Sequence, residues 1–189
     1  MSAGDFFEEG KRFFVDGKYE ESIEAFTKAA DAGYEQTICF LSRGVAYLKL
    51  HRSDDAIGDF SWVIDVREDN SRAYYYRGMA RAQKGNYEKA AEDFSRAIAQ
   101  KPGEATFLFA RGAAYIEMGK LEEAGQDIKN AANYLASASQ GYANMIGDRT
   151  HLDKVLAVLE GERRAGALEI NDAEFEAIRQ MIESGLGKE

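Results

Sequence analysis

The sequence predicts an all-α protein built from tandem helix pairs, and two features carry this prediction. Three kinds of residue recur at a constant spacing of 34 positions. They are a glycine, a large apolar residue and a smaller apolar residue: Gly10, Gly44, Gly78 and Gly112; Phe26, Phe60, Phe94 and Ile128; Ala29, Val63, Ala97 and Ala131. The 189 residues also include a single proline, as expected when nearly every segment is helical, because proline breaks helices. A period of this length, split into two amphipathic runs, is typical of stacked helix–turn–helix repeats.

Residues 71–102 show the repeat unit most clearly. An aromatic-rich amphipathic run breaks at the sequence KGNY, and a second amphipathic run stops at the only proline. Gly78 is expected to lie where the two helices nearly touch, with the small residue Ala90 opposite it. The same pattern predicts four repeats, at residues 3–36, 37–70, 71–104 and 105–138.

The turn inside each repeat carries a residue suited to ending a helix. Gly17, Gly85 and Gly119 can adopt the positive φ that terminates a helix at low cost. His51 takes this place in the second repeat. Ser53, two residues later, is expected to cap the next helix by accepting hydrogen bonds from its first amides.

Arginine and aspartate occur together in the last three repeats, and both are absent from the first. An arginine precedes the recurring glycine and an aspartate follows 16 residues later, in the pairs Arg43 and Asp59, Arg77 and Asp93, and Arg111 and Asp127. The first repeat has Glu9 and Ala25 at these two places. Joint presence and absence predicts an ion pair between paired helices or neighbouring repeats, which fixes register more than it adds stability. A ligand-binding role for the arginines is the alternative.

Residues 139–189 leave the repeat pattern. The spacing of Leu152, Val155, Leu156 and Leu159 predicts an amphipathic helix. Asn171 or Asp172 can cap a last helix, and its apolar face would consist of Phe175, Ile178, Met181 and Ile182. We expect this helical extension to cap the array, because a repeat array must cover its terminal apolar face.

On these four in-register copies, the chain resembles the tetratricopeptide repeat (TPR) family over residues 3–138. The resemblance implies a right-handed α-solenoid of four helix pairs, in which the first helix of each repeat lines a concave groove. It also implies an adaptor or scaffold that binds other proteins and has no enzymatic activity. It leaves the partner unspecified, because function resides in sites rather than in folds.

The ligand-facing places of the family, carried onto this chain, are mostly apolar. The residues predicted to line the groove and contact a partner are Phe7, Lys11, Phe14, Leu41, Val45, Leu48, Arg72, Tyr75, Met79, Phe109, Ala113 and Ile116. An apolar surface of this extent is a liability in water unless something covers it. We therefore expect a hydrophobic peptide or an amphipathic helix of another protein to bind there, with Lys11 and Arg72 orienting any acidic flank.

Three alternatives remain open for these apolar side chains. The last helix of the chain can fill the groove, or another copy can fill it in a self-assembling scaffold or homo-oligomer. The side chains can also pack between the helices and contact no partner.

The best-known function of the family, capture of the acidic C-terminal tail of heat-shock chaperones, is not expected. That function requires a clamp for two carboxylates, and the corresponding places here hold Phe7, Lys11, Ser42, Arg72 and Tyr76. Lys11 and Arg72 alone do not hold two carboxylates bidentately.

Composition and motifs argue against other classes of function. The net charge of −9 disfavours nucleic acid and anionic membrane surfaces as partners, and no apolar run reaches the ~18 residues of a spanning helix. His51 and His151 are far apart, and Cys39 stands beside apolar residues on a helix. No catalytic residue, cofactor or metal site is therefore expected. The lone cysteine fits a reducing compartment, so we expect the cytoplasm, although a leaderless exported protein would look the same.

Overall fold

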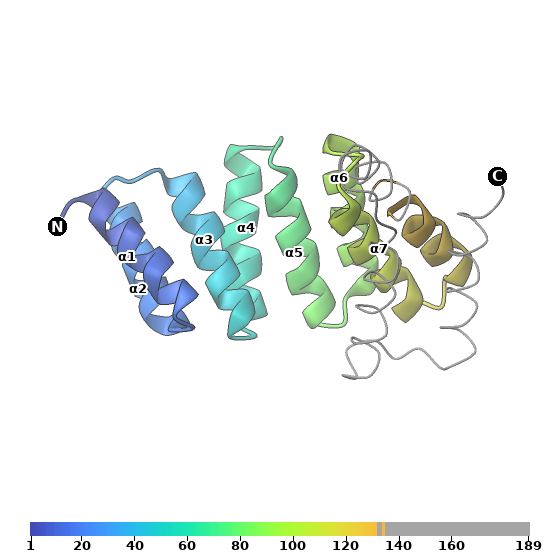
Figure 1. Cartoon of the computed structure of the whole chain (residues 1–189), viewed down its shortest axis with the longest axis horizontal. Coiled ribbons are helices and arrows are strands. Elements are labelled where there is room, and N and C mark those ends of the chain that lie inside the picture. Colours follow the sequence, from blue (N-terminus) through green and yellow to red (C-terminus); the bar gives the residue numbers. More distant parts are fainter. Residues whose placement is uncertain (132–133, 135–189) are drawn as a thin grey trace, which may run out of the picture. The chain divides into compact units, whose positions relative to one another are not determined.

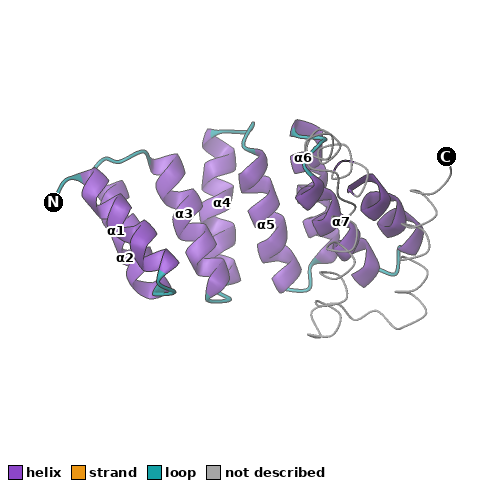
Figure 2. Cartoon of the chain, in the orientation of Figure 1, coloured by secondary structure: helices purple, strands orange, loops and turns teal. Residues whose placement is uncertain are grey.

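The computed structural model describes residues 1–131 and residue 134. The described residues form helices joined by short turns and contain no strand (Figures 1 and 2). The described part of the chain is therefore an all-α helical solenoid, as the sequence predicts. The capping extension predicted at residues 139–189 lies outside the described residues.

Six helices form the first of two compact units, which covers residues 1–100. They are α1 (Ala3–Val15), α2 (Tyr19–Asp31), α3 (Gln36–Lys49), α4 (Ser53–Val66), α5 (Ser71–Gln83) and α6 (Tyr87–Gln100). Each helix packs on the next along the chain, and the first helices α3 and α5 also touch (Figure 1). The second unit, residues 101–189, contains α7 (Ala105–Glu117) and a helical segment at residues 121–131 among its described residues.

The recurring large apolar residue forms the centre of each repeat. Phe26, Phe60, Phe94 and Ile128 are almost completely buried. A Cβ added to Gly78 would lie 2.6 Å from a carbon of the Phe94 ring, so glycine lets the ring of the second helix enter the contact. The atoms nearest to Gly78 thus belong to the Phe94 ring, and the expectation that Ala90 also meets this glycine stays a prediction.

The predicted turn geometry is confirmed, whereas the predicted cap is not. Gly17, Gly85 and Gly119 have φ of 72° to 75°, and His51 adopts 55° at the equivalent position. Ser53 is the first residue of α4, and its side chain makes no capping hydrogen bond. Its buried hydroxyl donates instead to Oε1 of Gln83 at 3.0 Å. A tertiary bond to the end of α5 thus replaces the local cap.

Each predicted arginine–aspartate ion pair joins the two helices of one repeat. Nε and Nη2 of Arg77 donate to the Asp93 carboxylate at 3.0 and 2.9 Å. The corresponding distances are 2.9 and 2.7 Å for Arg43 with Asp59, and 2.7 Å for both bonds of Arg111 with Asp127.

Arg43 and Arg77 also reach the preceding repeat. Nη1 of Arg43 donates to Thr27 on α2 at 2.9 Å, and Nη1 of Arg77 donates to Ser61 on α4 at 3.1 Å. Burial raises the pKa of Asp59, against the lowering effect of Arg43, while the hydrogen bonds that Arg43 donates to Asp59 raise the pKa of Arg43. The bidentate geometry requires an ionised carboxylate, because guanidinium groups only donate. The pair thus carries a desolvation cost, as expected of an ion pair that fixes register.

Candidate functional site

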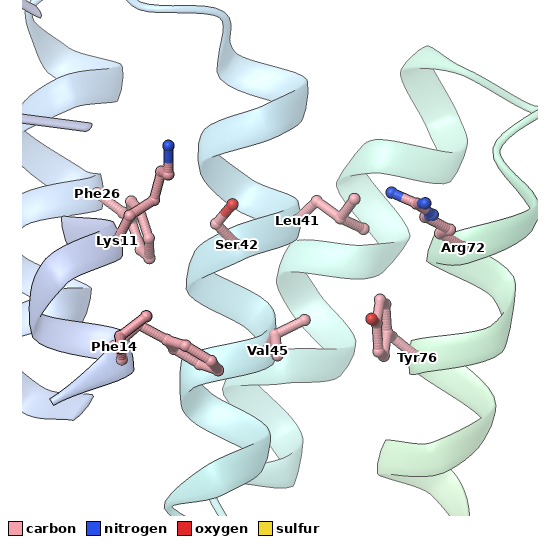
Figure 3. Close-up of a pocket in the computed structure, with 9 residues that line it drawn as sticks. Lys11, Phe14, Phe26, Leu41, Ser42, Val45, Arg72 and Tyr76 are labelled. Atoms are coloured by element: carbon pink, nitrogen blue, oxygen red, sulfur yellow. The ribbon is translucent and has the colours of Figure 1, made fainter. Parts of the chain in front are cut away.

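A pocket of about 320 Å³ opens on the face formed by the first helices α1, α3 and α5 (Figure 3). Its lining is mainly apolar, and we call it the apolar pocket. The lining residues are Lys11, Phe14, Val15, Phe26, Leu41, Ser42, Val45, Arg72 and Tyr76. This volume is typical of the smaller binding sites in proteins.

Helix periodicity explains why these residues meet. Residues three or four positions apart lie on the same face of a helix, so each first helix presents two residues, one turn apart, to the pocket. Lys11 and Phe14 come from α1, Ser42 and Val45 come from α3, and Arg72 and Tyr76 come from α5. Phe26 comes from α2 and also belongs to the core.

The pocket has a polar row and an apolar row, each crossing the three first helices. In Figure 3, Lys11, Ser42 and Arg72 lie along the upper edge, with Leu41 between the last two. Phe14, Val45 and Tyr76 lie along the lower edge, one helical turn further along each helix. The pocket is therefore amphipathic across its width.

The two cations of the polar row differ in their partners. Nζ of Lys11 donates to both oxygens of Glu8, at 2.9 and 2.8 Å. Within the described residues, neither the Arg72 guanidinium nor the Ser42 hydroxyl makes a hydrogen bond or ion pair with another protein group. Arg72 thus has its full set of donors available to a ligand.

The structure brings five of the twelve predicted contact residues together. Lys11, Phe14, Leu41, Val45 and Arg72 all line the apolar pocket. Leu41, Val45 and Phe14 are half-buried, while Lys11 and Arg72 are exposed.

Three predicted contact residues belong to the core and offer almost no surface. Phe7, Leu48 and Ile116 are only 8%, 6% and 8% exposed. The Phe7 ring stacks on Tyr34 at 4.6 Å and lies 5.3 Å from the Phe26 ring. For these three residues the alternative of packing between helices describes the structure better than partner contact.

The remaining four predicted residues do not line the apolar pocket. Tyr75 is half-buried, and its ring lies 5.2 Å from Tyr76 and 5.9 Å from Phe94. Met79 is exposed on α5. Phe109 and Ala113 are half-buried on α7, in the second unit.

Sequence reasoning left four lining residues out of the predicted groove: Val15, Phe26, Ser42 and Tyr76. Ser42 and Tyr76 occupy places that correspond to the carboxylate clamp of the family, so their positions could have predicted that they line the groove. Their residue types could not, because serine and tyrosine do not fit that clamp. Val15 follows Phe14 at the end of α1. Phe26 gave no surface signal, because its spacing marks it as a core residue.

The described residues hold little that suggests other chemistry. Among them, no group of three or more histidine, cysteine or acidic side chains is placed to hold a metal ion. No described helix is long and apolar enough to cross a membrane. Cys39 is 1% exposed, and burial raises the pKa of its thiol to about 11. This thiol is therefore protonated at neutral pH and is a poor nucleophile.

The sequence of the chain matches a known family. The family model described as tetratricopeptide repeat matches residues 7–57, 41–105 and 85–141. These overlapping matches cover more than half of the chain. The chain belongs to the TPR family. A search of curated protein sequences gives no significant match to this TPR protein.

Several solved structures resemble the TPR protein. YrrB, described as a TPR protein with an unusual peptide-binding site, is 25% identical, with a TM-score of 0.62 over 70% of this chain and 68% of that chain. The second TPR domain of human RPAP3, solved with the HSP70 peptide SGPTIEEVD, is 28% identical, with a TM-score of 0.56 over 59% and 93%. MamA from Desulfovibrio magneticus is 18% identical, with a TM-score of 0.68 over 72% and 77%. The MamA likeness shows the fold alone.

Proposed function

We propose that this TPR protein is a non-enzymatic adaptor whose apolar pocket takes apolar side chains from a segment of another protein. The observation that carries the proposal is the pocket itself. Three consecutive first helices place half-buried apolar side chains around an opening of about 320 Å³. Side chains held in this way lose little conformational freedom when a ligand covers them.

Burial of apolar surface supplies enough free energy for a specific complex. A large apolar side chain gains roughly 1.5–3 kcal/mol when it is fully buried. Micromolar affinity corresponds to about 8 kcal/mol, so a few such anchors suffice once the ordering costs are met.

Two similar proteins support a peptide as the partner. YrrB is described as having a peptide-binding site, and the RPAP3 domain was solved with an HSP70 peptide. We do not propose the chaperone tail as the ligand here. Phe7 and Tyr76 occupy two of the clamp places, and Lys11 is paired with Glu8. We propose the cytoplasm as the location, because the chain has a single cysteine.

The test compares two glutamate substitutions on α3 in the full chain. Val45→Glu places a charge inside the apolar pocket, whereas Ile38→Glu places one on an exposed apolar residue outside it. We expect Val45→Glu to lose the proteins that the wild-type chain captures from an extract of its source, and Ile38→Glu to keep them. Ser42→Trp, which fills the pocket without adding charge, should behave like Val45→Glu.

Circular dichroism would establish that each variant is folded. Equal capture by the wild-type chain and both pocket variants would contradict the proposal. Sedimentation at several concentrations separates the self-assembling alternative. A concentration-dependent dimer that Val45→Glu disrupts would mean that the pocket meets another copy of the chain.

A further inference from the structure

We infer that the apolar pocket binds an extended segment of a partner in which an acidic residue alternates with large apolar residues. This inference rests on the proposed protein-binding function and names the chemistry of the bound segment. Three observations carry it: the two rows of the pocket, the unequal pairing of its two cations, and the fixed apolar wall at Tyr76.

The two rows match the geometry of an extended chain that crosses the three first helices. Successive side chains of an extended chain point to opposite sides. A segment that crosses α1, α3 and α5 would direct one set of side chains to the polar row and the other set to the apolar row (Figure 3). A pocket of about 320 Å³ has room for a few side chains, whereas a whole helix is about 10–12 Å across.

Charge defines where the acidic residue lies. Among the described residues, Lys11 and Arg72 are the only charged ones that line the apolar pocket, and both are basic, although the chain carries a net charge of −9. Glu8 already holds Lys11 through both carboxylate oxygens. The guanidinium of Arg72 is exposed and, within the described residues, has no carboxylate partner. A carboxylate of the ligand therefore belongs at the α5 end of the polar row.

The apolar row determines which ligand side chains lie on the other side of the segment, away from the acidic residue. Phe14 and Val45 are half-buried, and the Tyr76 ring is held against Phe60 at 5.7 Å with the planes inclined by 23°. Such a wall is formed before the ligand arrives, which reduces the ordering cost of binding. Large aliphatic or aromatic side chains of the ligand are expected there.

A single available guanidinium takes one carboxylate, so the segment does not need a free chain terminus. A peptide that presents both an acidic side chain and its C-terminal carboxylate would require a second free cation beside Arg72. Lys11 does not supply it, because it is already paired with Glu8. The pocket is therefore suited to a segment from within a partner chain.

The experiment uses synthetic peptides with blocked ends and the full chain at physiological ionic strength, where the long-range repulsion between the acidic chain and acidic peptides is screened. The first peptide alternates leucine with glutamate, and the second alternates leucine with glutamine. The third has the composition of the first but places its leucines three and four residues apart, as a helix requires. A fourth repeats the first with a free C-terminal carboxylate. Fluorescence polarisation gives each dissociation constant.

We expect the leucine–glutamate peptide to bind about two- to fivefold more tightly than the leucine–glutamine peptide, as for one charge-assisted hydrogen-bonded contact at an exposed site. Arg72→Gln should remove this difference. Arg96→Gln should keep it, because Arg96 is another exposed arginine without a carboxylate partner among the described residues and does not line the pocket. Lys11→Gln should have a smaller effect than Arg72→Gln.

Several outcomes would overturn the inference. They are equal effects of Arg72→Gln and Arg96→Gln, a larger effect of Lys11→Gln than of Arg72→Gln, tighter binding of the helix-spaced peptide, or binding of the free-terminus peptide alone. Val45→Glu separates this inference from the proposed function. If the glutamate and glutamine peptides bind equally and Val45→Glu abolishes both, the proposed function stands and the inference fails. If no peptide binds, or if Val45→Glu changes none of the affinities, both fail.

Discussion

Arg77 and Arg72 lie five residues apart on α5 but differ in what surrounds them. The Arg77 side chain is 15% exposed and is held by Asp93, itself 4% exposed. Arg72 is exposed at the rim of the apolar pocket and, among the described residues, has no carboxylate partner. Repetition with the same partner in three repeats marks Arg77 as structural, whereas Arg72 has no counterpart in that pattern.

Arg77→Leu should therefore weaken the fold and leave ligand binding unchanged. Removing one member of a buried ion pair costs about 3–5 kcal/mol. We expect a loss near the lower end of this range, because Arg81 also contacts Asp93, at 2.8 Å. Denaturant unfolding measures the loss, and the leucine–glutamate peptide should keep its affinity within about twofold, as for a change away from the site. A large loss of affinity in the folded variant would show that this arginine serves the ligand.

At the scale of helices, the contact between the two members of a pair depends on glycine. A Cβ added to Gly44 or Gly78 would lie 2.5 or 2.6 Å from a carbon of the Phe60 or Phe94 ring. These rings are almost fully buried and cannot move away without opening the core.

Gly78→Ala should destabilise the protein by about 1–3 kcal/mol, the usual range for overpacking a well-filled core. Gly58→Ala is the matched control on α4, because a Cβ there meets nothing within 4 Å. It should stabilise the protein by up to about 1 kcal/mol through helix propensity. Urea unfolding of the two full-length variants measures both values, and equal effects would mean that the glycine–ring contact is unimportant.

The helices were predictable from sequence because their signals are local and repeated. Spacing and turn residues identified the helix pairs, and even His51 adopts the positive φ expected of its position. The error at Ser53 arose where a tertiary contact competes with a local one. Ser53 bonds to Gln83 on α5 and not to its own helix.

The site was less predictable, because equivalent positions in a repeat have different neighbours. Phe7 and Leu41 occupy the same place in successive first helices. Phe7 is buried under the stacked ring of Tyr34, whereas Leu41 lines the apolar pocket. Five of the family positions line the apolar pocket, and the packed neighbours determine which side chains remain accessible.

At the scale of the whole molecule, the apolar pocket takes its lining from three consecutive repeats. Each first helix contributes one residue to the polar row and one to the apolar row, so a bound peptide segment would need all three helices. The acidic chain as a whole repels acidic partners at long range, and this repulsion is screened at physiological salt. The proposed binding through Arg72 and the apolar row would therefore be a short-range property of these three helices.

The most direct measurement places a photoreactive amino acid at one of two exposed valines. Val15, 84% exposed, lies at the apolar pocket, whereas Val66, 56% exposed, lies on α4 outside it. After irradiation with the labelled leucine–glutamate peptide, we predict a covalent adduct from residue 15, lost when Val45→Glu is added, and none from residue 66. An adduct from residue 66 alone, or an adduct from residue 15 that persists with Val45→Glu, would contradict the account.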